Sequence, residues 1–282
     1  MIVIGDISRI NTNIGALAAL NTLKYVNANL EKSQLKIATG KELNQTTNNP
    51  ANATLSTFLT ARRRGMSAAL LNTQIARNVL EIAEGGLIKI AEVLVNMREK
   101  ILQAVHDALG PVEKSAIQNE LVQKAYEIDD LVNETEFNER KLLDGTYKNV
   151  SYQIGENVSD TLLVNLFQNN TAVGLNVDST NVADKILTHE GALEALTNVK
   201  NAHETVLSTL NYIGSVVVRL TVQEQSLTIG IANHLAVNNR LADADLAKEQ
   251  LDSTRFQLLQ QTSGTTLAQA NLSPQNVLAL FQ

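Results

Sequence analysis

Residues 206–231 read VLSTLNYIGSVVVRLTVQEQSLTIGI, and this stretch has the strongest periodic signal in the chain. Its seam positions are separated alternately by four and three residues: Val206, Leu210, Ile213, Val217, Leu220, Glu224, Leu227 and Ile231. Such spacing over more than three heptads is typical of a coiled-coil helix. We interpret Glu224 as a residue that reaches to the edge of the seam. A long coiled-coil helix is therefore expected over residues 190–240.

A second long helix is expected upstream, because residues 51–109 contain no proline and carry another apolar seam. Its predicted members are Val79, Ile82, Gly86, Ile90, Val93, Met97, Ile101, Ala104 and Ala108. At 1.5 Å per residue this helix would be roughly 85 Å long, which predicts a rod. Gly110 and Pro111 should end it, and a third helix over residues 113–132 should run back along it.

Between residues 142 and 176 the pattern changes to that of a hairpin. Residues 150–154 and 161–167 are typical of short strands, separated by a turn at Gly155. The segment 168–184 is rich in Asn, Thr and Ser, and we expect it to be the most exposed loop of the chain.

The two ends of the chain predict helices that pair with each other. Residues 13–39 carry an apolar series that includes Ile14, Leu17, Leu20, Leu23 and Leu30. Residues 257–282 read QLLQQTSGTTLAQANLSPQNVLALFQ, without a charge, and apolar residues lie on more than one side of the helix they would form. Those expected to be covered are Leu259, Leu267, Ala270, Val277, Leu278 and Phe281. The predicted fold class is thus mainly α, a coiled-coil rod with a short β-hairpin region and paired terminal helices.

Composition excludes several classes of function. With a net charge of −6 and no basic stripe interleaved with aromatics, the chain is not expected to bind nucleic acid. The absence of Cys removes disulfides and thiolate sites. No segment approaches the ~20 apolar residues of a membrane span, and residues 1–13 lack the apolar core of a signal peptide, so neither membrane insertion nor a cleaved leader is expected. The four histidines have no metal-binding spacing, so we expect no enzyme, metal or cofactor.

Several blocks of sequence, in this order, resemble bacterial flagellin over essentially the whole chain. They include INTN at 10–13, LKIATGKELN at 35–44, EGGL at 84–87, QIGEN at 153–157, ADAD at 242–245, LAQAN at 267–271 and PQNVL at 274–278. The resemblance implies a filament subunit whose terminal helices surround a central channel. Segment 168–189 leaves no room for the outer domains that many flagellins insert, which implies a minimal, core-only form.

The resemblance also implies a division of the chain. Residues 1–44 and 241–282 would supply the inner core of the filament, whereas 45–189, with the hairpin at 142–176, and 190–240 would form the rod. The implied partners are other copies of the chain, the flagellar cap, the hook–filament junction proteins and an export chaperone. The protein would be extracellular, exported unfolded through the flagellar type III apparatus.

One departure from the family pattern keeps an alternative function open. TTNNPAN at residues 46–52 is more similar to the hook–filament junction proteins, although the blocks at the C-terminus favour flagellin. A flagellin-like cell-surface binding protein is a further alternative, with the polar loop 168–184 as its ligand face.

A second departure concerns the segment that resembles the site read by the vertebrate Toll-like receptor for flagellin. This segment comprises Leu94, Asn96, Arg98, Glu99 and Lys100. Asn96 stands where the family has Arg, and Lys100 where it has Leu, so the resemblance implies weak or no recognition.

Overall fold

The computed structural model describes residues 13–44, 49–106 and 109–279, with side chains as far as Leu272. Of the predicted assembly residues, Val277, Leu278 and Phe281 lie outside the described side chains, as does Ala108 of the predicted seam.

The described part of the chain is mainly α-helical, as predicted. Its long helices are α1 (Ile14–Thr39), α2 (Pro50–Ala104), α3 (Pro111–Glu134), α4 (His189–Ala242) and α5 (Leu246–Ala279). The shorter elements are β1 (Glu136–Phe137), β2 (Arg140–Lys141), β3 (Tyr147–Gln153), β4 (Thr161–Leu166) and the 3-10 helix η1 (Ala183–Leu187). Most of the predicted helix boundaries are therefore correct to within a few residues.

Local sequence explains where the helices begin and end. The Asn13 side chain accepts a hydrogen bond from the Ala16 N–H at 2.9 Å and so caps α1. Gly40 ends α1 in the left-handed conformation, with φ at 67°, and its N–H donates to the Lys36 carbonyl at 2.8 Å. Asp245 caps α5 by accepting from two backbone N–H groups. These signals act within one helical turn, which is why the sequence alone reveals them.

The chain forms two compact units. Unit 1 consists of residues 1–61 with 233–282, and unit 2 of residues 62–232. Both α2 and α4 contribute residues to each unit.

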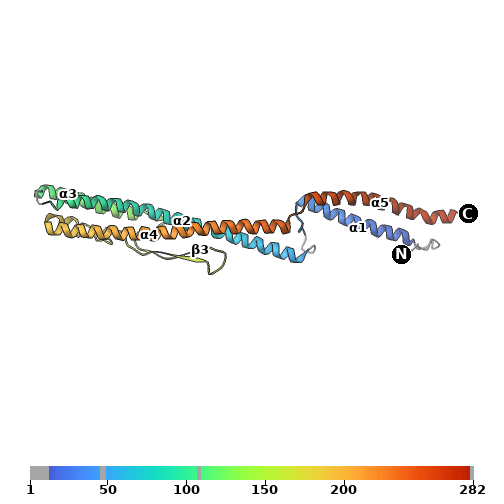
Figure 1. Ribbon diagram of the computed structural model, residues 1–282, viewed down its shortest axis with the longest axis horizontal. Helices are drawn as coiled ribbons and strands as arrows, with labels where there is room; N and C mark the ends of the chain where they lie inside the picture. The colour runs from blue at the N-terminus through green and yellow to red at the C-terminus, as the bar shows by residue number, and fades with distance from the viewer. Residues whose placement is uncertain (1–12, 45–48, 107–108, 280–282) are drawn as a thin grey trace. The chain divides into compact units, whose positions relative to one another are not determined.

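In unit 1, α1 and α5 lie side by side and antiparallel (Figure 1), which confirms the predicted pairing of the terminal helices. The Asn13 amide donates to the Ala270 carbonyl at 2.7 Å near one end of the pair. Near the other end the Ser33 hydroxyl donates to Glu249 at 2.9 Å. Beyond α1, the backbone of Glu42 donates to the Ala242 carbonyl at 2.7 Å, so the chain segments that adjoin the pair are joined as well.

In unit 2, one hydrophobic core is shared by α2, α3, α4, the strands and the segment that follows them. On α2 most of the buried positions alternate in steps of four and three, and Leu59, Val79 and Val93 are buried in addition; the alternating positions are Ala69, Thr73, Ala76, Leu80, Ala83, Leu87, Ile90, Leu94, Met97, Ile101 and Ala104. Val79, Ile90 and Met97 of the predicted seam are buried, but Ile82 is 42% exposed and lies outside it. The prediction for Ile82 is wrong because Ala83, one residue further on, faces the core and turns Ile82 toward the surface.

On α4, Val206, Ile213, Leu220 and Leu227 are buried, whereas Leu210 and Val217 are half-buried. Arg77 Nε lies 3.3 Å from Glu224 Oε1, so the charged seam position forms an ion pair with α2. The expectation that no segment approaches a membrane span is wrong for α4. An 18-residue window of it has a mean hydropathy of 1.3, enough by length and composition, although one such helix is weak evidence for a span.

The strands confirm the predicted hairpin. β3 and β4 are antiparallel, with Val150 opposite Val164 and Gln153 opposite Thr161, and β1 pairs with β2. Leu162, Val164 and Leu166 of β4 are buried in the core of unit 2.

The segment that follows β4 is not the exposed loop that its composition suggested. Its buried members are Asn170, Ala172, Leu175, Val177, Val182 and Ala183. The backbone N–H of Asn170 donates to the Leu143 carbonyl at 2.9 Å, and that of Ala172 to the Asp129 carboxylate at 2.8 Å. Apolar residues spaced among the polar ones anchor this segment, and the polar count alone concealed them.

Candidate assembly surfaces

On the α5 side, the buried interior of the α1–α5 pair consists of polar side chains. Among the described side chains of α5, those that are buried are Glu249, Ser253 and Ser263, and none of them is apolar. On α1 the buried residues are Ala19, Val26, Leu30 and Ser33. The positions of α5 that turn toward α1 follow a heptad spacing: Glu249, Ser253, Phe256, Gln260, Ser263, Leu267 and Ala270. Small residues at such positions let two helices approach closely.

A buried carboxylate lies at one end of this interior. Glu249 accepts hydrogen bonds from Ser33 at 2.9 Å and from the Lys36 ammonium at 3.0 Å. Lys36 also donates to Glu42 at 2.7 Å. Burial lowers the pKa of Lys36, but its hydrogen bonds to Glu42 and Glu249 outweigh that effect and hold the pKa above its ordinary value. The two helices are therefore held in one register by a charged and fully bonded group.

Many large apolar residues of the pair lie on its outside, whereas Val26 and Leu30 are buried between the helices. On α5, Leu251 is 74% exposed and Leu258 is 60% exposed. The other exposed large apolar residues of the two helices are Ile14, Leu17, Tyr25, Leu35, Leu246, Leu259 and Leu272. We call this surface the outer face of the pair. A soluble protein rarely exposes so large an apolar surface unless a partner covers it.

The structure places the predicted assembly residues in both locations. Ile14, Leu17 and Leu259 lie on the outer face, whereas Leu30 is buried between the helices. Leu20, Leu23, Leu267 and Ala270 are half-buried. Sequence reasoning missed Glu249 and Ser33, because a lone serine and a lone glutamate in a polar helix carry no distinctive signal.

The polar residues of α5 are also divided between the two locations. Gln260 donates to Asn27 of α1 at 2.8 Å. Gln261 and Gln269 are exposed, and the hydroxyls of Thr262 and Thr266 bond to carbonyls of their own helix. A small notch of about 110 Å³ lies between the helices, lined by Ala19, Thr22, Thr262, Ser263 and Thr266.

The segment that resembles a receptor site is only partly on the surface. Leu94 is 0% exposed and belongs to the core of unit 2, so it is not available to a receptor. Asn96, Arg98 and Glu99 are exposed. The Lys100 ammonium lies 2.8 Å from the carboxylate of Glu120 on α3.

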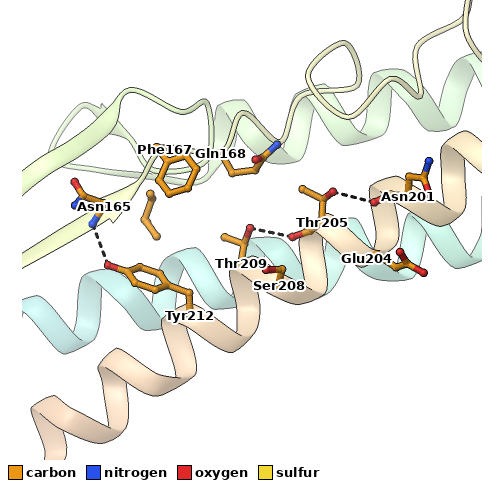
Figure 2. Close-up of a pocket in the computed structure, with 10 residues that line it drawn as sticks. Asn165, Phe167, Gln168, Asn201, Glu204, Thr205, Ser208, Thr209 and Tyr212 are labelled. Carbon is orange, nitrogen blue, oxygen red and sulfur yellow. Dashed lines mark hydrogen bonds between the residues drawn. The ribbon is translucent and has the colours of Figure 1, made fainter.

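Unit 2 also contains an open groove of about 630 Å³ between the end of β4 and α4 (Figure 2). It is lined by Asn165, Leu166, Phe167, Gln168, Asn201, Glu204, Thr205, Ser208, Thr209 and Tyr212. The Tyr212 hydroxyl accepts from the Asn165 N–H at 3.2 Å, and Thr205 and Thr209 bond to carbonyls one turn back. The groove offers hydrogen bonds and two aromatic rings, and its one carboxylate, Glu204, is exposed to solvent.

Among the described residues, 13–44, 49–106 and 109–279, no three His, Asp or Glu side chains are placed to hold a metal ion together. At the start of α4, the ring nitrogen Nδ1 of His189 lies 3.1 Å from the Val105 carbonyl oxygen.

Comparison with known proteins points to one family. The family model of the bacterial flagellin N-terminal helical region matches residues 10–148, and that of the bacterial flagellin C-terminal helical region matches residues 196–281. The flagellin of Bacillus subtilis (strain 168) is 33% identical, over 97% of this chain and 100% of its own length. The flagellin of Halalkalibacterium halodurans is 30% identical, over 94% of this chain and 98% of its own length.

Among solved structures, that of Bacillus cereus flagellin is similar over 56% of this chain and 88% of its own length. The identity is 22% and the TM-score 0.48.

Proposed function

Because this chain belongs to the bacterial flagellin family and is a subunit of the extracellular flagellar filament, we propose that it polymerises through the outer face of its α1–α5 pair. The observation that carries this proposal is the inverted distribution of side chains on α5. Glu249, Ser253 and Ser263 are buried, whereas Leu251 and Leu258 are exposed.

An isolated helix pair with this pattern would have low stability, since the burial of leucines is the main source of stability in such a structure. In a polymer the same pattern is favourable. The terminal helices of neighbouring copies can bury each exposed leucine. Full burial of one such side chain stabilises the assembly by about 1.5–3 kcal/mol. Such contacts join different surfaces of successive copies, so they repeat into an open helical filament.

In this arrangement the polar residues on the outside of α5 have a role too. Gln261 and Gln269 are exposed and uncharged, and we infer that they line a wet central channel. An uncharged polar lining would let an unfolded chain pass without strong attachment. The proposal includes export of the unfolded chain through the flagellar type III apparatus, with the help of a chaperone. The filament would start from the hook–filament junction proteins and grow beneath the flagellar cap. The chain would have no enzymatic activity.

Two sets of variants test the assembly surface. Removal of residues 273–282, and separately the double substitution Leu251→Gln with Leu258→Gln, should prevent elongation of filaments from purified monomers. The double variant should leave the far-ultraviolet circular dichroism of the monomer unchanged, because both side chains are exposed. Val112→Gln, at an exposed valine of unit 2, is the control and should elongate normally. Filaments of normal length from either terminal variant would contradict the proposal.

The alternative role is that of a hook–filament junction protein. It rests on Asn49 and on Pro50, the first residue of α2. Genetic complementation separates the two roles. A filament subunit should restore long filaments to a strain that lacks flagellin, whereas a junction protein should restore them only to a strain that lacks the junction.

We also propose that the vertebrate Toll-like receptor for flagellin recognises this chain weakly or not at all. Asn96 cannot supply the charge of the Arg that the family has there, and Lys100 is paired with Glu120 where the family has an apolar residue. The loss of two anchors from the centre of an interface weakens binding by about 2 kcal/mol or more for each.

A further inference from the structure

Two long helices of unit 2 each carry a short row of exposed apolar side chains. The row on α2, which we call the α2 row, consists of Leu71, Ile75 and Ile82. The α4 row consists of Val218, Val222 and Ile229. These six side chains are between 42% and 65% exposed. Rows of this kind usually mark a surface that a partner covers.

Neither row faces the core of its own unit. On α2 the residues that directly follow Ile75 and Ile82, namely Ala76 and Ala83, are fully buried. On α4 the buried positions are Leu220 and Leu227, each two residues before a member of the row. One residue turns an α-helix by about 100°, so the α2 row lies to the side of Ala76 and Ala83, with the buried Val79 between the row and these alanines, whereas the α4 row lies opposite Leu220 and Leu227.

The two rows have the same length and the same height along unit 2, although their spacings run in opposite directions because α2 and α4 are antiparallel. In each row the second residue follows the first by four positions and the third follows the second by seven. The ion pair between Arg77 Nε and Glu224 Oε1, 3.3 Å apart, shows that the middles of the two rows lie at the same level along α2 and α4. Arg77 lies between Ile75 and Ile82, and Glu224 between Val222 and Ile229. Each row is therefore about 16 Å long and covers the same stretch of the unit.

We propose that the α2 row of one copy packs against the α4 row of a neighbouring copy in the filament. The inference rests on the proposed function, because a filament supplies the neighbouring copies. Two different surfaces meet in this contact, so it can repeat from copy to copy without closing. Rows of equal length and height allow the side chains of two adjacent copies to interdigitate over their whole length.

The small size of the rows indicates that they meet only within an assembled filament. Three half-exposed side chains present a patch on the order of a few hundred Å². A stable pair of free proteins buries about 800 Å² on each partner. The contact is therefore too small to hold two free monomers together. It forms once the terminal helices hold neighbouring copies at high effective concentration.

Opposite charges placed in the two rows test the contact. Ile75→Lys alone and Val222→Glu alone should each raise the monomer concentration needed for elongation roughly tenfold or more, because an unpaired charge would be buried between copies. The double variant Ile75→Lys with Val222→Glu should recover most of the loss, because each copy then presents Lys to the Glu of the next. Wild-type seeds supply the filament end in every case.

The control is Val112→Lys, at an exposed valine of α3 that belongs to neither row. It should elongate with the wild-type critical concentration, and all variants should keep the thermal unfolding curve of the monomer. Equal impairment by Val112→Lys, or additive losses in the double variant, would overturn the pairing of the rows.

Two outcomes separate this inference from the proposed function. If both single variants elongate normally while Leu251→Gln with Leu258→Gln does not, the row contact is wrong and assembly by the terminal helices stands. If wild-type monomers float with phosphatidylglycerol vesicles and Val222→Glu abolishes this flotation, the α4 row binds lipid, and the inference is again overturned.

Discussion

The Ser33 hydroxyl donates a 2.9 Å hydrogen bond to the carboxylate of Glu249, and both side chains are buried between α1 and α5. The two residues are 216 positions apart in the chain. A carboxylate that is buried with its bonds satisfied is costly to displace, so this contact determines the register of the terminal helices.

Substitution of Glu249 should therefore loosen the pair. Glu249→Ala leaves the Ser33 hydroxyl without its acceptor and should destabilise the α1–α5 pair by about 1–3 kcal/mol. Hydrogen exchange of assembled filaments is the measurement, and faster exchange across α1 and α5 is expected. Gln250→Ala, at the exposed neighbouring position, should leave exchange unchanged. Equal exchange in the two variants would show that Glu249 does not hold the register.

The stability of the same pair should fall at alkaline pH. The pKa of Lys36 is raised in the folded state, since its bonds to Glu42 and Glu249 outweigh the effect of burial. Lys36 therefore stabilises the folded pair fully below its ordinary pKa of 10.5. This stabilisation is lost as the pH rises through the higher pKa that Lys36 has in the folded state. Thermal unfolding of filaments between about pH 9 and pH 12 should show a smaller decline in Lys36→Gln than in the wild type. Lys32→Gln, at an exposed lysine, should behave like the wild type.

Two adjacent glycines of α2 should respond in opposite ways to alanine. A Cβ at Gly86 would lie 2.4 Å from Thr135 Oγ1 and 2.9 Å from Leu143 Cδ1, so Gly86→Ala should destabilise unit 2 by about 1–3 kcal/mol. A Cβ at Gly85 meets nothing within 4 Å. Gly85→Ala should therefore stabilise the helix by up to about 1 kcal/mol. Urea unfolding of the monomer measures both, and a stable Gly86→Ala would contradict the close packing.

The receptor proposal predicts a weak response of cells. A reporter line that carries the vertebrate Toll-like flagellin receptor should not respond to nanomolar protein. Asn96→Arg combined with Lys100→Leu should strengthen the response by at least about tenfold, because it restores the charge and the apolar contact of the family. A full response to the wild-type chain would disprove the proposal.

The seams of α2 and α4 illustrate how far sequence patterns reach. On α4 the heptad carries an apolar residue at every predicted position but Glu224, and four of its predicted members are buried. On α2 the alanines at 76, 83 and 104 belong to the seam, whereas Leu71, Ile75 and Ile82 are exposed. A pattern based on the largest apolar residues therefore selects the wrong phase for part of α2. The correct phase depends on where α3, α4 and the strands pack.

The terminal helices show the same limit in another form. The surplus of apolar residues on residues 257–272 indicates that the helix needs more than one partner, and this can be recognised without a structure. The structure adds that α1 covers the side with Glu249, Ser253 and Ser263, and that the leucines remain outside.

The sequence alone determined the positions of the helices and their ends, because capping residues, helix breakers and heptad spacing act over a few residues. The ordered sequence blocks also indicated the family. Only the tertiary structure decided which side of each helix is buried and which side remains for other copies. That choice depends on contacts between segments as distant as Ser33 and Glu249, and no local pattern contains them.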